Sequence, residues 1–86
     1  MKNTRELIAE ELRSMRAKKQ LSIETVAELS GVNKDTISRY ENNLVSMNLE
    51  NLEKLLKVYN CDFAIFFTNI YANKHNIAAA IETYDS

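Results

Sequence analysis

The chain lacks a long apolar run, a second cysteine and any proline. None of its 86 residues belongs to an apolar stretch long enough for a transmembrane helix, so we expect no membrane partner. The first residues, MKNTRELIAEEL, alternate charged and apolar side chains and lack the apolar block of a signal peptide. Cys61 is the only cysteine and cannot form an internal disulfide, which is typical of a cytoplasmic protein.

The sequence also lacks the residue sets that enzymes and metal proteins use. It contains no nucleophile–base set, no phosphate-binding loop and no cofactor motif, and adjacent Glu10 and Glu11 point in diverging directions on a helix. Cys61 has no histidine at ligand spacing, and His75, the only histidine, lies in a polar stretch where solvent exposure is expected. We therefore predict no enzyme, no metal, no cofactor and no small-molecule substrate.

Positive charge is scarce over the whole chain but is concentrated at one end. The net charge of −1 and the pI near 5.8 count against a simple nucleic-acid binder. Residues 1–20 nevertheless carry six basic and three acidic side chains, a local net charge of +3. Local charge decides where phosphates dock, although a solvated helix face would show the same pattern.

Helical periodicity dominates what is present. With 45% hydrophobic residues, the chain is predicted to form one small all-α domain with five helices. The first helix runs to about Lys19. The expected N-terminal caps are Asn3, Ser22, Asn33, Asn48 and Asp62. The side chains expected to face the core are Ile8, Leu12, Met15, Leu21, Val26, Ala27, Leu29, Ile37, Tyr40, Leu49, Leu52, Leu55, Leu56 and Tyr59.

Gly31 is the only glycine and separates two short helical patterns, Ser22–Ser30 and Asn33–Asn42. A sharp turn between helices usually needs a residue with positive φ, which glycine adopts without a Cβ clash. The segment therefore reads as helix, tight turn, helix, a pattern typical of DNA-binding proteins.

The last third of the chain is compatible with two structures. Phe63, Phe66, Phe67 and Ile70 fall on one face of a helix, whereas alternation of Phe63, Ile65 and Phe67 would suit a strand. The helical pattern continues beyond strand length and is favoured. Residues 73–76 are a candidate break, and residues 77–84 are compatible with a further helix or a tail.

The second helix of the turn motif carries polar side chains on its outward face. Asp35, Ser38, Arg39 and Asn42 lie at helical spacing, and Lys34 projects from the first turn. An α-helix fits the major groove, where the fork of Arg39 can pair both acceptors of guanine. Lys34 can reach a guanine or a phosphate. Asp35 can accept from cytosine or simply complement the helix dipole.

These residues make the chain resemble the Cro/cI-type helix-turn-helix family of phage repressors and restriction–modification controller proteins. The matching segments are Leu12–Arg16, Leu21–Ser22, Val26–Ala27, Ser30–Val32, Thr36–Asn42, and Leu49 with Leu52 and Leu55. The resemblance implies a compact five-helix repressor-like domain that binds operator DNA as a two-fold dimer. It places base reading at Lys34, Asp35, Ser38 and Arg39.

The resemblance also implies contacts to the DNA backbone. The residues at these positions are Ser22, Ile23, Asn33, Asn42 and Asn43, and the loop from Asn43 to Ser46 belongs to the same phosphate-contacting stretch. Ile23 replaces a frequent glutamine that binds phosphate, but the backbone N–H groups at this helix start remain suitable donors. Asn43 and Met47 replace a frequent glycine and proline, so a looser loop is expected.

The resemblance also implies an ion pair and a dimer helix. Arg16 and Glu41 match a semi-buried ion pair joining the first helix to the end of the third, the alternative being two unrelated surface charges. The interval 62–71 resembles the dimer helix of controller proteins. The implied interface residues are Phe63, Phe66, Phe67 and Ile70, which could instead close a monomer core.

The expected organisation is a helix-turn-helix domain over residues 1–60 and a helical dimerisation segment over residues 61–86, with a possible extra C-terminal helix or tail. The expected function is a cytoplasmic transcriptional regulator, a repressor that binds double-stranded DNA at a pseudo-palindromic operator as a homodimer. One alternative is an antitoxin whose residues 72–86 bind a toxin, which would be an additional protein partner. Another is a protein-interaction module that has lost DNA binding.

Overall fold

The computed structural model describes residues 2–74, which form five helices and no strand. The helices are α1 (Thr4–Lys19), α2 (Ile23–Ser30), α3 (Lys34–Glu41), α4 (Leu49–Val58) and α5 (Phe63–Lys74). The all-α prediction is confirmed, and the helix predicted from Phe63 onward is observed in place of a strand. The expectations for His75, the last part of the 73–76 break and residues 77–84 lie outside the described residues.

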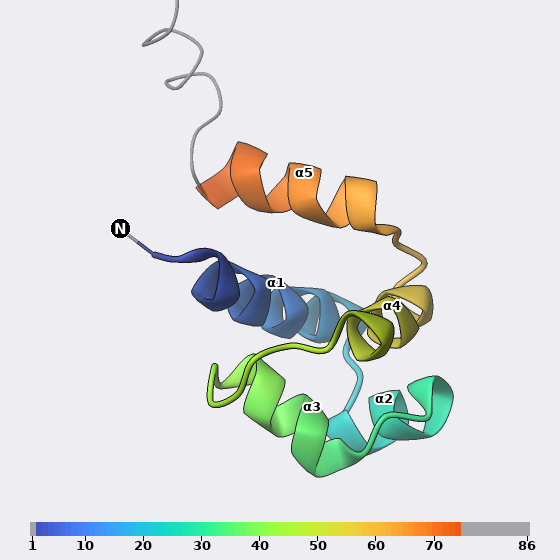
Figure 1. The fold of residues 1–86 in the computed structure, drawn as a ribbon. Helices are drawn as coiled ribbons and strands as arrows, with labels where there is room; N and C mark the ends of the chain where they lie inside the picture. Colours follow the sequence, from blue (N-terminus) through green and yellow to red (C-terminus); the bar gives the residue numbers. More distant parts are fainter. Residues whose placement is uncertain (1, 75–86) are drawn as a thin grey trace, which may run out of the picture.

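Three layers make up the fold. α1 and α4 lie in the middle, the pair α2 and α3 packs on one side of them, and α5 covers the other side (Figure 1). Within the described chain, no helix is long and apolar enough to cross a membrane. The arrangement leaves one long face of α3 without a covering element.

The side chain before each helix caps its first turn. In all five cases an oxygen of the residue preceding the helix accepts a backbone N–H from that turn, at 2.8–3.1 Å. These contacts satisfy donors that have no partner inside the helix. The predicted caps are Asn3, Ser22, Asn33, Asn48 and Asp62, and all are present.

The core is continuous through all three layers. It contains Leu7, Ile8 and Leu12 from α1, Val26 from α2, Ile37 and Tyr40 from α3, Leu52, Leu55, Leu56 and Tyr59 from α4 and its end, and Phe66 and Ile70 from α5. Because Phe66 and Ile70 are fully buried, α5 is part of this core and not an appendage. The hydroxyl groups of Tyr71 and Thr4 also lie 3.3 Å apart, joining the end of α5 to the start of α1.

Two predicted core residues are exposed. Leu29 and Leu49 keep 65% and 69% of their surface in contact with solvent. Leu29 lies in the last turn of the eight-residue α2, and Leu49 is the first residue of α4. A short helix buries only the turns that cross a neighbouring helix. Residues at its ends can therefore follow the apolar period and still be exposed.

Candidate nucleic-acid interface

Gly31 ends α2 in the left-handed conformation with φ of 78°, and its N–H donates to the carbonyl of Ala27 at 2.9 Å. A Cβ atom at this position would meet no atom within 4 Å. Glycine is therefore favoured here by the positive φ of the backbone, and not by a lack of space for a side chain. The turn lets α3 begin three residues later and cross α2, as the sequence predicted.

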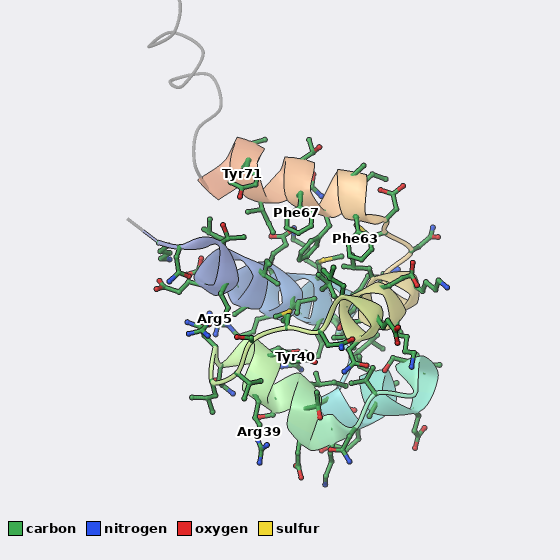
Figure 2. All side chains as sticks on the ribbon, in the orientation of Figure 1. Arg5, Arg39, Tyr40, Phe63, Phe67 and Tyr71 are labelled. Atoms are coloured by element: carbon green, nitrogen blue, oxygen red, sulfur yellow. The ribbon has the colours of Figure 1, made fainter. Side chains whose placement is uncertain are left out.

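α3 divides sharply between a buried and an exposed face. Ile37, Tyr40 and Glu41 are buried against the rest of the fold. On the other side Lys34, Asp35 and Arg39 are exposed and Ser38 is half-buried. Arg39 points away from the body of the molecule (Figure 2). The structure thus brings the four residues expected to read bases onto one accessible ridge, the shape that an α-helix needs to enter a major groove.

The residues expected at the DNA backbone have local roles in the structure. The side-chain oxygens of Ser22 and Asn33 cap α2 and α3, and Ile23 packs against the core. The Asn42 amide donates to the carbonyl of Ser38 at 2.8 Å, folding back over the end of α3. At Ser22 and Ile23, backbone N–H groups of the first helical turn are the donors best suited to a phosphate.

Arg16 and Glu41 form the ion pair that the resemblance implied. The Arg16 Nε lies 2.9 Å from one carboxylate oxygen of Glu41, and Nη2 lies 2.9 Å from the other. Nη1 donates to the carbonyl of Leu21 at 3.0 Å. The Glu41 side chain is only 4% exposed, and its hydrogen bonds raise the pKa of Arg16. One guanidinium therefore joins α1, the turn before α2 and the end of α3.

Two further arginines of α1 reach the end of α3 and the loop after it, contacts that the sequence did not predict. Arg13 donates to the main-chain carbonyl of Glu41, in the last turn of α3. Arg5 donates from Nε to the side-chain oxygen of Asn43 at 2.7 Å, and its Nη1 lies 3.5 Å from the Ser46 hydroxyl. Arg5, Arg13 and Arg16 fall on one face of α1 at helical spacing, a signal that the sequence does contain.

Tyr40 fixes the other end of the loop between α3 and α4. Its hydroxyl oxygen accepts from the Asn51 amide at 3.0 Å and lies 3.4 Å from the backbone nitrogen of Asn48. The ring itself is 3% exposed. The loop over residues 42–48 is therefore held by Arg5 of α1 at Asn43 and Ser46, and by Tyr40 of α3 near its junction with α4.

Besides Arg16, two titratable groups among the described residues have shifted pKa values. Burial raises the pKa of Tyr59 to about 12, with a smaller contribution from the Glu41 charge. Burial also raises the pKa of the Cys61 thiol, which keeps it protonated and poorly nucleophilic. Within residues 2–74, no group of three or more histidine, cysteine, aspartate or glutamate residues is placed to hold a metal ion.

The structure separates the four residues expected at a dimer interface. Phe66 and Ile70 lie in the core of the single chain and expose no surface, which is the alternative that the sequence left open for them. Phe63 and Phe67 are partly buried against the same core, with ring centroids 6.4 Å apart. The outward face of α5 instead carries Ile65, which is 51% exposed, beside exposed Ala64, Thr68 and Ala72. The helical period explains this division, because the most apolar face of α5 is the one that packs inward.

Comparisons with known proteins agree with this geometry. The model of the HTH_3 helix-turn-helix family matches residues 12–66. Among solved structures, the chain is similar to an HTH_3 family transcriptional regulator from Vibrio cholerae, with 29% identity and a TM-score of 0.70. The match covers 76% of this chain but only 36% of that protein, so the chain spans little more than a third of its length. No curated protein matches.

Proposed function

The chain belongs to the HTH_3 helix-turn-helix family, and on this premise we propose that it is a sequence-specific DNA-binding transcriptional regulator. The observation that carries the proposal is the exposed ridge of α3, where Lys34, Asp35, Ser38 and Arg39 project from a helix whose other face is buried. We assign base reading to these four side chains and no catalytic role to any residue.

Arg39 is the principal reader in this proposal. Its guanidinium is exposed and directed outward (Figure 2), and a bidentate contact to guanine is the commonest specific contact in the major groove. Asp35 lies one turn earlier on the same ridge, and Ser38 directly precedes Arg39. Lys34 stands at the helix start, where it reaches either a base edge or a phosphate.

The proposed active form is a homodimer on a pseudo-palindromic operator in the cytoplasm. Two α3 helices would enter successive major grooves about 34 Å apart. Support for self-association comes from α5, whose outward face leaves Ile65 half-exposed between small side chains. Helices approach closely where side chains are small, so two copies of this face can pack together. We further propose repression by occlusion of the promoter.

Selection of bound duplexes from a random pool tests the proposal, because it detects DNA binding and returns the operator. Arg39→Ala should then lose about 1–3 kcal/mol of discrimination at one base position in each half-site, with an unchanged helical circular-dichroism spectrum. The matched control is Lys57→Ala, which removes one exposed positive charge from α4, outside the α3 ridge. Failure to recover any duplex would overturn the function. Recovery with discrimination intact in Arg39→Ala would overturn only the role of Arg39.

A further inference from the structure

The end of α3 is an unfavourable place for a phosphate unless a cation stands beside it. The carbonyl groups at a helix C-terminus carry partial negative charge, and the buried carboxylate of Glu41 lies in the same turn. Arg16 neutralises Glu41, and Arg13 contacts its main-chain carbonyl. The charge of Arg16 is therefore compensated, and Arg13 contacts α3 itself and not the loop that follows.

Arg5 supplies positive charge to that loop. Its guanidinium is held by two neutral acceptors from the loop, the Asn43 side-chain oxygen at 2.7 Å and the Ser46 hydroxyl at 3.5 Å. Within residues 2–74, the structure pairs it with no carboxylate. The side chain is exposed, and a guanidinium has five N–H donors, of which these contacts use two. Arg5 is therefore oriented by the loop while its charge remains available.

The position of Arg5 suits a ligand that already contacts α3. In Figure 2 Arg5 projects to the left from α1, beside the start of the loop between α3 and α4, and Arg39 projects downward from α3 below that loop. Asn43 has a left-handed backbone with φ of 56°, and its N–H and that of Leu44 close the end of α3 through the carbonyls of Tyr40 and Arg39. The turn that places the Asn43 oxygen on Arg5 is thus an extension of α3 itself.

We propose that Arg5, together with Asn43 and Ser46, forms a binding site for one phosphodiester of the DNA backbone. The guanidinium provides the charge, and the two loop side chains fix its direction. The site deepens the proposed function and rests on it. It adds a contact from the first helix to those expected from α2, α3 and the loop, and it contributes affinity without base preference.

Salt dependence of DNA binding tests the site. The probes are the selected operator duplex and an unrelated duplex of equal length, with affinities measured between about 50 and 200 mM salt. Arg5→Ala should reduce the slope of log K against log salt by about 0.9 for each half-site, equally for both duplexes. Over that fourfold salt range, the loss of slope corresponds to a change of about 3.5-fold in the binding constant for each half-site.

Two matched variants separate a phosphate contact from other effects. Lys18→Ala also removes one exposed charge from α1, but it lies about 20 Å further along the helix and should leave the slope near that of the wild type. Arg5→Lys keeps the charge without the fork, so it should retain most of the slope. An Arg5→Ala slope equal to that of Lys18→Ala, or an Arg5→Lys slope as low as that of Arg5→Ala, would overturn the site.

The two proposals fail in different ways. A wild-type chain that binds neither duplex would overturn the proposed function and the site with it. If the wild-type chain binds DNA and Arg5→Ala has the same salt slope as the wild type, the site alone is overturned and the α3 ridge remains as the DNA contact. Circular dichroism of each variant establishes that the compared proteins are folded.

Discussion

Glu41 is an acidic side chain almost completely removed from solvent, and its charge is compensated by one residue of another helix. The Arg16 guanidinium contacts both of its carboxylate oxygens and also the carbonyl of Leu21. Burying an ion pair gives little net stability, because both ions lose their hydration. Removing one partner is different, since the other charge then remains buried without compensation.

We therefore expect Arg16→Ala to lower the free energy of unfolding by about 2–3 kcal/mol, less than for a fully buried pair because Arg16 is one-quarter exposed. Lys18→Ala, an exposed control on the same helix, should stay within about 0.5 kcal/mol of the wild type. Urea unfolding measures both. A double-mutant cycle with Glu41→Gln should show coupling of about 1–2 kcal/mol, and additive effects would contradict the interaction.

The contrast between Arg16 and Arg5 shows what the sequence could supply at the residue scale. The Arg16–Glu41 pair was predictable because both residues match a family pattern in register. The contact of Arg5 with Asn43 was not, because it depends on how residues 42–48 fold back toward α1. The sequence placed three arginines on one face of a helix but carried no local signal for what that face would meet.

Helix ends determine how the elements of this chain meet. With one glycine and no proline, three of its left-handed turn positions are occupied by Gln20, Asn43 and Asn60, with φ of 55–56°. After α1 and α4 the same pair of backbone hydrogen bonds closes the helix as after α3. Asparagine tolerates this conformation, whereas for glutamine the Cβ clash is uncompensated.

Replacing Gln20 by glycine should therefore stabilise the fold by about 0.5–1 kcal/mol, the relieved clash exceeding the added freedom of the unfolded chain. Lys18→Gly is the matched control, because it places glycine inside α1 and should cost about 1 kcal/mol. Thermal unfolding followed by circular dichroism compares them. A Gln20→Gly protein that melts below the wild type would show that this turn is not strained.

The sequence predicted where helices start more reliably than how deeply they are buried. Capping is a local interaction between residues two or three apart, so Asn3, Ser22 and Asn48 could be identified without the fold. Burial at helix ends depends on the neighbouring element. Leu29 and Leu49 fit the apolar pattern of their helices, but they lie beyond the turns that contact the core.

On the scale of the whole molecule, α5 has two distinct faces with two distinct roles. Its inward face contributes Phe66 and Ile70 to the common core, with Phe63 and Phe67 partly buried beside them. Its outward face has no covering element in the described part of the chain and exposes Ile65. The sequence predicted a dimer helix but could not distinguish these faces, because both contain apolar residues.

The dimer prediction is therefore now made for the outward face. Ile65→Glu should convert a dimer into a folded monomer, because it adds a charge to the proposed contact without entering the core. Phe67→Glu should instead destabilise the chain by about 2 kcal/mol or more, because that partly buried ring packs edge-on against the fully buried Phe66. Leu29→Glu, which adds a charge at an exposed leucine on α2, should leave the dimer intact.

Sedimentation at micromolar concentration, combined with thermal unfolding, distinguishes these outcomes. Operator affinity should fall with Ile65→Glu because a monomer occupies one half-site and loses the effective concentration that links the two. A monomeric wild-type chain, or a dimer that survives Ile65→Glu, would remove this face from the interface. A Phe67→Glu chain that dissociates but keeps its melting temperature would restore the aromatic side of α5 as the contact, because a charge inside a packed core cannot leave stability unchanged.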